Sequence, residues 1–401
     1  MTAALSLRPY QVAGRDFLAS RRFALLADEM RVGKTPQAIR AADAIGAEKV
    51  LVVCPAIAVP QWRTEFARWS DRAGLPLLEV VSYDMAKRRS ADLLRPQWNV
   101  VIVDECHFAK NPDAQRTRLI YGKEGLGWHT ERMWALSGTP APKHAAELWP
   151  MLRAFGVTCM DYNQFVSRYC RVDWFSGKPV GTKEKHVPEL RELLGKIMLR
   201  RTRKQVAPDM PTIGFSFLNV ELSATVDLAF SGDPEANPLA DLENRMAVAN
   251  AKALPLVEHI ELALANGLLK QTVVFGWHVE PLRRVSEALR QRGIAAVTIT
   301  GATSQAVRSQ LQSDFKRGRL QVLVANVLAA GTAIDLSVAS HGYFLELDWL
   351  PGTNVQAANR LVSLDKKEPV TFDICTSPGT VDDRIQKILL RRATELATIY
   401  A

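Results

Sequence analysis

Three residues near the N-terminus, Gly33, Lys34 and Thr35, have the types and the order that phosphate binding needs. They follow an apolar segment at residues 23–26 that predicts a strand, and they begin a segment with helical periodicity. Backbone N–H groups at such a helix start point toward phosphate oxygens, Lys34 adds positive charge, and the Thr35 hydroxyl can ligate magnesium. The generic GxxxxGK[ST] pattern is incomplete, because Asp28 stands at its first glycine. The triplet indicates a nucleotide-phosphate site, and a chance GKT at a helix start is the alternative.

Two neighbouring acids, Asp104 and Glu105, follow a run of β-branched residues in the segment NVVIVDECH. The run predicts a buried strand, and ligands of open parallel sheets bind at the carboxyl ends of strands. Asp104 can hold magnesium directly or through water, while Glu105 can orient and deprotonate the water that attacks a γ-phosphate. Paired acids also cap helices or occupy solvated turns, which is the alternative. Their position after a phosphate loop favours nucleotide hydrolysis, and we interpret His107 as part of the acid motif.

The wider pattern predicts two α/β units that position these residues. From residue 1 to about 145, apolar segments alternate with helical ones, as in FALLAD, TPQAIRAADAI, KVLVVCP and NVVIVDE. A second series begins near residue 270 with QTVVFGW, PLRRVSEALRQRG and AAVTIT. Such alternation favours parallel sheets with helices on both faces. The segment between them looks mainly helical, and FSGDPEANPLADLE is the best linker candidate because Gly, Pro, Asn and Asp interrupt its periodicity.

Composition and charge narrow the class of protein. With 401 residues and 47% apolar residues, the chain can bury the cores of folded domains. The formal charge of +9 favours a polyanionic partner, because each neutralised phosphate releases counterions; a solvated basic surface is the alternative. Apolar runs are shorter than the ~18 residues of a membrane span, and the opening segment lacks the layout of a secretory signal. We expect no membrane partner and a cytoplasmic location.

The cysteines are scattered, with no CxxC pair and no Cys/His cluster at the spacing of metal ligands. We therefore expect reduced thiols and no structural zinc. The five cysteines are Cys54, Cys106, Cys159, Cys170 and Cys375.

With the phosphate loop and the acid pair placed, nearly the whole chain resembles the Swi/Snf branch of helicase superfamily two. The motifs of the first half are LRPYQ, LLADEMRVGKT, LVVCPAIAVPQW, WALSGTPAP and VIVDECH, a variant of the DEAH box. The middle segments ELWPMLRAFG, YNQFVSRYC and LLGKIMLRRTRKQV resemble the helical insertion of this branch. The second half is most similar to the annealing-helicase subgroup, with VVFGWHVEPL, ITGATSQAVR, VLAAGTAIDL, YFLELDWLPG and QAANR in family order.

The resemblance implies an α/β fold of two RecA-like lobes, each a parallel sheet flanked by helices, with a helical insertion between them. We expect an ATP-binding lobe 1 at residues 1–145 and the helical insertion at residues 146–210. A linker and helical segment at 211–262 and lobe 2 at 263–401 complete the expected organisation. Arg31 stands where the family usually has a glycine.

The resemblance also implies ATP and magnesium between the lobes, with Gln11 at the adenine, and DNA contacted mainly through phosphate and sugar. The expected catalytic residues are Lys34, Asp104, Glu105 and Arg360, and the expected magnesium ligands are Thr35 and Asp104. The expected ATP-binding residues are Arg8, Gln11, Asp28, Glu29, Met30, Arg31, Val32, Gly33, Lys34, Thr35, Gly331, Asp335, Gln356 and Arg360. The expected DNA-binding residues are Pro55, Thr139, Thr300, Gly301 and Thr303. Ordinary turn chemistry is the alternative for the threonines and the glycine.

The last motif departs from the family pattern. It supplies Arg360, but Ser363 stands where the family has a second arginine aimed at the phosphates. An arginine of this kind can contribute ~10³ or more in rate in other phosphoryl-transfer enzymes. Three interpretations stay open: Arg360 alone suffices, a nearby cation such as Lys366 substitutes, or the protein binds ATP and hydrolyses it poorly. We favour slow, DNA-stimulated hydrolysis.

The sequence thus predicts a DNA-stimulated ATPase, an ATP-driven translocase or remodeller that acts on double-stranded DNA as a monomer. One alternative is a strand-separating helicase of the same superfamily. The other is an ATP-gated DNA-binding switch with weak hydrolysis. A compact motor with so little attached to it suggests a bacterial or phage source.

Overall fold

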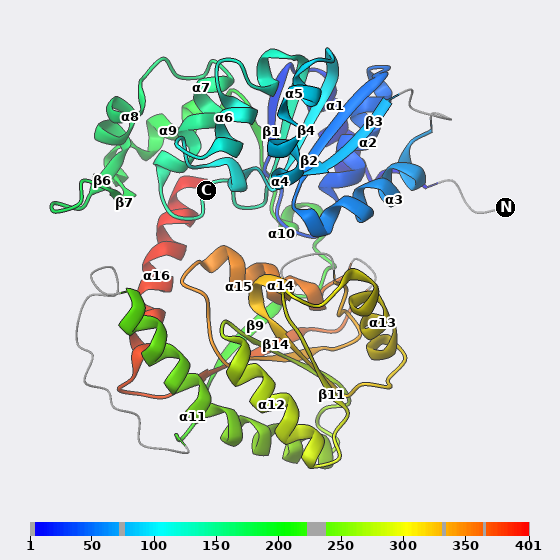
Figure 1. The fold of residues 1–401 in the computed structure, drawn as a ribbon, viewed down its shortest axis with the longest axis vertical. Helices are drawn as coiled ribbons and strands as arrows, with labels where there is room; N and C mark the ends of the chain where they lie inside the picture. The colour runs from blue at the N-terminus through cyan, green and yellow to red at the C-terminus, as the bar shows by residue number, and fades with distance from the viewer. Residues whose placement is uncertain (1–4, 72–76, 223–237, 331–333, 364–365, 401) are drawn as a thin grey trace. The chain divides into compact units, whose positions relative to one another are not determined.

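The computed structural model describes residues 5–71, 77–222, 238–330, 334–363 and 366–400. Gly331 and most of the predicted linker at residues 230–243 lie outside the described residues. The chain divides into two compact units, one of Met1–Pro208 with Ala393–Ala401, the other of Asp209–Arg392 (Figure 1). In the described parts of the chain, no helix is both long and apolar enough to cross a membrane.

The first unit is built on a parallel sheet with the strand order β3-β2-β4-β5-β1-β8. Its strands are β1 Phe23–Leu26, β2 Lys49–Cys54, β3 Leu77–Ser82, β4 Trp98–Asp104, β5 Thr130–Leu136 and β8 Met198–Leu199. Its α-helices are α1 Pro9–Ala19, α2 Lys34–Ala44, α3 Val59–Trp69, α4 Tyr83–Arg88, α5 Ser90–Leu94, α6 Gln115–Tyr121, α7 Trp149–Ala154, α8 Tyr162–Tyr169, α9 Val187–Gly195 and α10 Arg203–Val206. Short 3-10 turns are η1 Ala56–Ala58, η2 Cys106–Ala109, η3 Leu126–Trp128, η4 Ala145–Leu148 and η5 Glu184–His186.

Helices cover both faces of this sheet, so alternate residues of each strand are buried on opposite sides. In β2, Val50 and Val52 pack in the cluster that contains Trp62 of α3 and residues of α1 and α2. Leu51 and Val53 pack in the cluster formed with α4, α6, α7 and α8. Burial on both faces explains why the strands are continuous apolar runs in the sequence.

The parallel direction of β1, β2, β4 and β5 brings the segments that follow them to one edge of the sheet. Those segments contain the predicted phosphate loop, Pro55, the acid pair and Thr139. The fold therefore gathers these predicted residues of the first unit along one edge.

After β5 the chain forms helices and an antiparallel hairpin, β6 Cys170–Val172 with β7 Pro179–Thr182, before it returns to the sheet. The returning strand β8 pairs with β1, Leu25 beside Met198 and Leu26 beside Leu199. The sequence patterns predicted mainly helix between the two α/β series, so they did not predict strand β8. A strand of two residues is too short to show any period.

The second unit also has a parallel sheet, in the order β11-β12-β10-β13-β14-β9. Its strands are β9 Ile213–Asn219, β10 Thr272–Gly276, β11 Ala296–Ile299, β12 Val322–Asn326, β13 His341–Phe344 and β14 Val370–Thr376. Its helices are α11 Pro238–Ala265, α12 Val279–Gln291, α13 Gln305–Lys316, α14 Val327–Ala330 and α15 Pro351–Ala358, with the 3-10 turn η6 Asn359–Leu361. Two α/β units with parallel sheets flanked by helices confirm the predicted fold class.

One face of the second sheet packs against α11 and α12 through Val274, Val324 and Tyr343. On the neighbouring strands β10, β13 and β14, the rings of Phe275, Phe344 and Phe372 contact one another with centroids 5.1 to 6.0 Å apart. Strand β9 lies at the edge and is mostly exposed, which explains why its sequence has no buried-strand pattern. It falls in the segment for which the sequence patterns indicated helix.

Helix α16, Val381–Tyr400, contributes Ala393–Tyr400 to the first unit. There the Tyr400 hydroxyl accepts a 2.8 Å hydrogen bond from Ala141 N, and the Arg191 guanidinium donates to Thr398 O. These contacts join the end of the chain to the segment that follows β5.

Candidate functional site

The loop between β1 and α2 has the backbone that a phosphate loop needs. Two of its residues, Arg31 and Gly33, have φ of 68° and 78°, in the left-handed region. Gly33 caps helix α2, and a Cβ there would lie 2.4 Å from Gln11 Nε2. The left-handed φ of Arg31 explains why a glycine would suit that position, since a residue with a side chain is strained there.

Gln11 of α1 lies beneath this loop and is 4% exposed. Its Nε2 donates to Val32 O at 3.2 Å, and its Oε1 accepts from Arg8 N at 2.9 Å. The Tyr10 hydroxyl donates to the same Val32 carbonyl at 3.0 Å. The structure thus brings Arg8 and Gln11 to the loop, as the sequence predicted for the ATP-binding set, and adds Tyr10.

Lys34 begins α2, and its ammonium lies over the loop. Its Nζ donates to Asp28 O at 2.8 Å and to Glu29 O at 3.2 Å. Burial lowers the Lys34 pKa, while the carboxylates of Glu105, Asp28 and Asp104 act to raise it. The ammonium is therefore within electrostatic reach of both predicted acids, although these follow a different strand.

Asp28 is fully buried behind the loop. Its carboxylate accepts from Arg201 Nε at 2.9 Å and from a second nitrogen of the same guanidinium, and from Gln37 Nε2 at 3.3 Å. Arg201 also donates to Gln37 Oε1 at 2.8 Å and to Tyr10 O. This bidentate pair holds the loop from behind, so Asp28 and Arg201 shape the site rather than line it.

Arg201 is a residue that sequence reasoning missed. It follows β8, where Ala27 N and Glu29 N donate to Leu199 O and Arg201 O at 2.8 and 3.0 Å. The neighbouring Arg200 donates to Ala27 O and Gly138 O, both at 3.1 Å. The basic run LRRTRK was the available signal, but its contact with the loop depends on pairing between distant strands.

Asp104 ends β4, and its carboxylate accepts two hydrogen bonds. Its Oδ2 accepts from Trp62 Nε1 of α3 at 2.7 Å, and its Oδ1 accepts from Glu105 N at 3.0 Å. Burial and the neighbouring Glu105 raise the Asp104 pKa, and the bond from Trp62 and the charge of Lys34 act to lower it. A carboxylate so placed gains from a cation, which would offset its burial.

Glu105 has a left-handed backbone, with φ of 49°. The Tyr83 hydroxyl donates to Asp104 O at 2.7 Å and lies 3.2 Å from Glu105 O, so it supports this turn. Backbone strain of this kind clusters at functional sites. Tyr83 and Trp62 are buried aromatic residues whose role the sequence patterns did not reveal.

A short polar chain links Glu105 to the segment after β5. His107 Nδ1 lies 3.3 Å from Glu105 Oε2 and 3.1 Å from Ser137 Oγ, and Thr139 N donates to Ser137 Oγ at 3.1 Å. Burial and the charge of Lys110 lower the His107 pKa to about 4, so the imidazole is neutral at pH 7. The acid pair is thus connected to Thr139 through neutral polar groups.

The loop itself also touches that segment. A Cβ on Gly138 would lie 3.2 Å from Met30 Cγ, so Met30 packs against this glycine. Pro55 is buried directly after β2 and precedes the turn η1. The two predicted DNA-binding residues of the first unit, Pro55 and Thr139, therefore follow the strands on either side of β4.

In the second unit, Arg360 lies in η6, after Gln356 of α15. Its carbonyl accepts from Leu336 N at 2.9 Å, which brings Arg360 beside Asp335 in the fold of this unit. Burial acts to raise the Asp335 pKa, but bonds from Lys316 Nζ at 2.6 Å and Ser337 N at 3.1 Å outweigh it and lower the pKa.

The predicted substitute cation, Lys366, is engaged within the second unit. Its Nζ donates to Ser337 O at 2.8 Å and to Ala339 O at 2.6 Å. Burial lowers its pKa. Lys366 therefore supports the loop of residues 337–339 in this structure, and its role as a substitute cation stays a prediction.

Thr300, Gly301 and Thr303 form a turn after β11. Thr300 N donates to Thr303 Oγ1 at 3.0 Å, and Ala302 N donates to Thr300 Oγ1 at 3.3 Å. Arg308 donates to Thr303 O at 2.9 Å and Thr300 O at 2.6 Å. The two threonine side chains take part in the turn, and Gly301 is exposed. The DNA contact of these residues stays a prediction.

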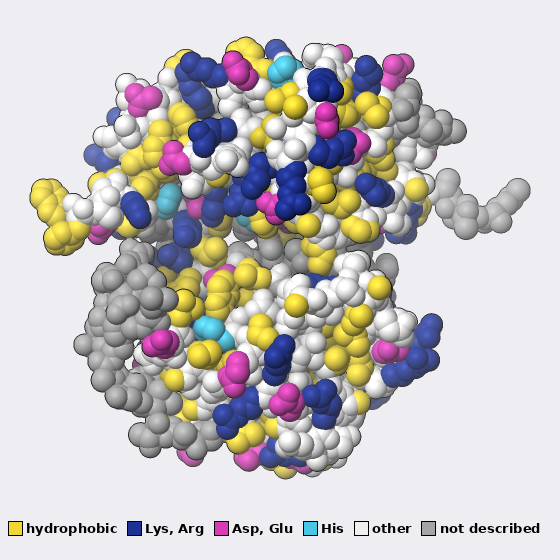
Figure 2. All heavy atoms as spheres, viewed as in Figure 1, with side chains coloured by type: hydrophobic (Ala, Val, Ile, Leu, Met, Phe, Trp, Pro, Cys, Tyr) yellow, Lys and Arg dark blue, Asp and Glu magenta, His cyan; other side chains and the backbone are white. Residues whose placement is uncertain are grey.

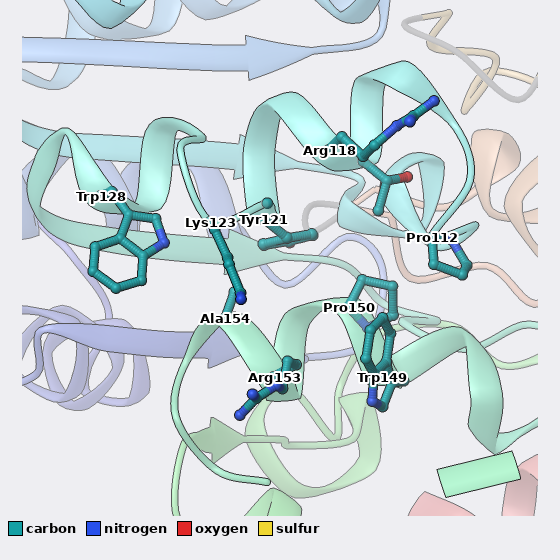
Figure 3. Close-up of a pocket in the computed structure, with 11 residues that line it drawn as sticks. Pro112, Arg118, Tyr121, Lys123, Trp128, Trp149, Pro150, Arg153 and Ala154 are labelled. Atoms are coloured by element: carbon teal, nitrogen blue, oxygen red, sulfur yellow. The ribbon is translucent and has the colours of Figure 1, made fainter. Parts of the chain in front are cut away.

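The first unit also has a hollow of about 700 Å³, which is lined mainly by residues of α6, η3 and α7 and by none of the predicted site residues (Figure 3). Trp128 of η3 and Trp149 of α7 approach it from different elements (Figure 3). The Trp149 indole N–H donates to Met160 O at 2.9 Å, and Arg153 donates to Thr158 O at 3.3 Å. Because these polar groups are used within the fold, we assign no ligand to this hollow.

The groups at the edge formed by β1, β4 and β5 are of the types that a triphosphate site needs. The edge offers a helix N-terminus with Lys34 for phosphates, oxygen donors on Thr35 and Asp104 for a divalent cation, and Glu105 as a base for water. An α/β fold with these groups at one sheet edge is typical of the phosphate-loop nucleotide hydrolases.

Comparisons with known proteins give the family. The model of the SNF2-related domain matches residues 10–80 and 77–252, and that of the Helicase conserved C-terminal domain matches residues 256–364. The chain belongs to the SNF2-related family, which confirms the predicted Swi/Snf membership.

Two curated relatives have informative names. The Bos taurus protein named SWI/SNF-related matrix-associated actin-dependent regulator of chromatin subfamily A-like protein 1 is 30% identical, over 96% of this chain and 44% of its own. The Homo sapiens protein named DNA annealing helicase and endonuclease ZRANB3 is 27% identical, over 96% of this chain and 40% of its own. The chain thus spans less than half the length of these relatives.

A solved structure titled Sulfolobus solfataricus SWI2/SNF2 ATPase core in complex with dsDNA is also similar. Its TM-score is 0.47 at 20% sequence identity, with 99% of this chain and 93% of that chain covered.

Proposed function

We propose that the protein is a DNA-stimulated ATPase that uses ATP to move along or remodel double-stranded DNA. The observation that carries the proposal is the convergence of Lys34, Asp104 and Glu105 at one sheet edge, with a polar chain from Glu105 to Thr139. Hydrolysis and DNA contact then share one edge of the first unit. The names of the two relatives, a chromatin regulator and a DNA annealing helicase, support DNA as the substrate.

Lys34 is the group that receives the phosphates. In the structure its ammonium is held by the carbonyls of Asp28 and Glu29, which fixes it above the loop. A triphosphate offers charged oxygens in place of these neutral acceptors, and charge-assisted bonds are stronger. The pair of Asp28 and Arg201 keeps the loop in place while Lys34 changes partners.

Glu105 is the group that orients and deprotonates water. Its backbone is fixed by Tyr83, and its Oε2 lies beside the neutral His107. Because His107 is neutral, it does not neutralise the Glu105 charge, and the carboxylate stays available as a base. The hydrogen bond between His107 and Ser137 and the bond from Thr139 N to Ser137 Oγ let a DNA contact at Thr139 alter the position of Glu105.

The chemistry of Asp104 supports a divalent cation, because its buried carboxylate lies beside another acid. Thr35, the second residue of α2, has a hydroxyl oxygen that can serve as a further ligand. When bound, magnesium would neutralise charge on the phosphates. We propose Mg²⁺ as the cofactor, held by these two residues.

Arg360 is proposed to act from the second lobe. Asp335 and Gln356, two further predicted ATP-binding residues, lie in the segments next to it within the same unit. Lobe closure on ATP would bring its guanidinium to the phosphates. The lobe boundaries at residues 145, 210 and 262, the remaining ATP- and DNA-binding residues, a monomeric state, a cytoplasmic location and a bacterial or phage source stay predictions.

Steady-state ATPase assays with no DNA, a single strand and duplexes of increasing length test the proposal. A translocase turns over faster on duplex than on single strands, and faster on longer tracks. The Lys34→Ala variant serves as the inactive control. Unwinding of a tailed duplex would favour the strand-separating helicase, and ATP-dependent DNA affinity without turnover would favour the switch. Purified protein with no measurable ATP affinity would end the proposal.

A further inference from the structure

Two adjacent aromatic residues, Trp174 and Phe175, stand at the tip of the β6–β7 hairpin. Their exposed fractions are 89% and 95%. Apolar side chains gather on the projecting tip of this hairpin in the space-filling view (Figure 2), and the ribbon shows the hairpin reaching away from the body of its unit (Figure 1). Exposed aromatic pairs of this kind mark binding sites, because each ring left in water forgoes a large burial energy.

The turn at the tip is closed by hydrogen bonds although its side chains are exposed. Ser176 N and Ser176 Oγ donate to Asp173 Oδ1 at 2.8 and 2.7 Å, and Gly177, with φ of 65°, donates to Asp173 O at 2.9 Å. Asp173 N donates to Lys178 O at 2.9 Å and closes the turn. The turn therefore defines the backbone that carries the two aromatic residues, and a backbone that is already ordered reduces the entropy lost on binding.

The base of the hairpin is anchored to the segment that follows Thr139. The Thr182 hydroxyl of β7 accepts from Ala145 N of η4 at 3.0 Å, and Thr182 is 3% exposed. Cys170 of β6 is also buried. The hairpin is thus fixed to the same part of the first unit that the proposed function assigns to DNA.

A basic hollow of about 810 Å³ lies at the base of the hairpin. Its lining includes Arg168, Lys183, Lys185 and His186. Lys183 Nζ donates to Ser167 O at 2.6 Å, which fixes one side, while Lys185 is exposed. Arg168 is paired with Glu189 at 2.7 Å, so Lys183 and Lys185 supply the positive charge of the hollow. Residues 168–189 contain five Lys and Arg against three acids, so the surroundings of the aromatic tip keep an excess of positive charge that attracts anions.

We propose that this hairpin binds single-stranded DNA at a junction with duplex, stacking unpaired bases on Trp174 and Phe175. The phosphates of the same strand lie along the basic hollow. A positively charged groove combined with aromatic platforms is the arrangement by which proteins bind single strands without reading their sequence. An apolar protein partner would instead favour apolar surroundings, whereas the tip is bordered by Arg171 and Lys178. The inference rests on the proposed function and adds a preference for junctions to it.

Direct binding without nucleotide tests the inference separately from ATP hydrolysis. Fluorescence anisotropy would be measured with a blunt duplex, the same duplex with unpaired tails, and a single strand. In the double variant Trp174→Ser/Phe175→Ser, we expect Kd for the tailed duplex and the single strand to rise about ten-fold per lost stacked base. Kd for the blunt duplex and duplex-stimulated ATPase should not change.

Three further variants make the result specific. Trp128→Ser removes another exposed tryptophan of the same unit, 68% exposed, and should leave all affinities unchanged. Trp174→Tyr keeps an aromatic ring for stacking and should therefore keep the affinity for single strands. Because the variant lacks the Trp174 indole, it should show less quenching of tryptophan fluorescence when a single strand binds. Lys185→Gln should weaken binding to the single strand and reduce its salt dependence.

Wild-type binding to all three DNAs by the double variant would overturn the inference and leave a protein partner as the occupant of the tip. An equal loss on the blunt duplex would overturn it too, because the tip would then contact duplex backbone. Neither outcome would contradict the proposed function, because duplex-stimulated ATPase activity of the wild type is measured separately. If the wild type itself neither binds DNA nor responds to it, the proposed function and the inference fail together.

Discussion

The indole N–H of Trp62 and the carboxylate of Asp104 meet across 2.7 Å at the carboxyl edge of the first sheet. Trp62 lies on α3, which follows β2, while Asp104 ends β4, the next strand in the sheet. Trp62 is 2% exposed, so the indole side of this bond is shielded from water. The segment after β2, which contains Pro55, is thereby tied to the proposed cation ligand.

Replacing Trp62 with phenylalanine should reduce kcat more than ATP affinity. The change removes the donor that orients Asp104 and favours its charged form, and a hydrogen bond to a charged group contributes about 1.5–3 kcal/mol. We expect turnover to fall about ten-fold and the Mg²⁺ concentration for half-maximal activity to rise. A magnesium titration of ATPase activity measures both. Trp69→Phe, on the same helix, is the control and should behave like wild type.

Removing the guanidinium of Arg201 should destabilise the first unit. Asp28 is fully buried, and Arg201→Ala would leave its carboxylate with Gln37 as the remaining side-chain partner among those described. Loss of one partner of a buried pair costs about 3–5 kcal/mol, so we expect a clear fall in Tm. The double variant Arg201→Met/Asp28→Asn removes both charges and should recover part of the loss. Thermal unfolding with and without ATP measures this; equal Tm values for Arg201→Ala and wild type would contradict the role of the pair.

The sheet and the ends of its strands could be predicted because both depend on local patterns. Strands β2 and β4 are buried on both faces, so they are continuous apolar runs, and the polar residues that follow them mark the carboxyl edge. Lys34, Asp104 and Glu105 were predicted from such positions, and the structure brings them together. Their roles in hydrolysis stay proposals.

The supports of the site could not be predicted in the same way. Arg201 reaches Asp28 across 173 residues of chain, and its contact depends on the pairing of β8 with β1. Trp62 and Tyr83 are aromatic residues in amphipathic segments, where packing is the ordinary interpretation. Their hydrogen bonds to the acid motif follow from the way in which helices fold back on the sheet, which a single sequence does not express.

The neutral state of His107 should make stability depend on pH. Its pKa in the folded protein is lowered to about 4 from 6.5, with burial as the main cause. Between these values the unfolded chain binds a proton that the folded protein does not, so the free energy of unfolding falls as pH decreases from about 6.5 to 4. The effect of this group is on the order of 3 kcal/mol at most. Chemical unfolding at pH 7 and pH 5 would measure it.

His107→Gln should make that loss of stability between pH 7 and pH 5 smaller. Other histidines, among them His144 and His341, also have lowered pKa values and contribute to the background. The difference between wild type and variant isolates the contribution of His107. A variant with the same pH dependence as wild type would show that folding does not lower the His107 pKa.

Thiol reactivity should separate one cysteine from the others. Cys159 is exposed, whereas Cys54, Cys106, Cys170 and Cys375 are buried. Burial raises the pKa of Cys170 to about 11 and raises the pKa of the other three further. We expect iodoacetamide to modify Cys159 alone in the native protein at pH 8, because thiolates react and buried thiols do not. Peptide mass mapping would identify the modified site, and rapid labelling of Cys106 would contradict the packing around the acid motif.

The pair of positions 360 and 363 tests how the second lobe takes part in hydrolysis. Arg360→Ala should abolish DNA-stimulated turnover while DNA affinity is kept, because an arginine finger can contribute ~10³ or more in rate. Ser363→Arg restores the family pattern and should raise turnover if the site lacks charge. Lys366→Ala should lower stability rather than turnover, since its ammonium holds the carbonyls of Ser337 and Ala339. Single-turnover ATPase and Tm of the three variants distinguish these roles. Full turnover in Arg360→Ala together with its loss in Lys366→Ala would make Lys366 the acting cation.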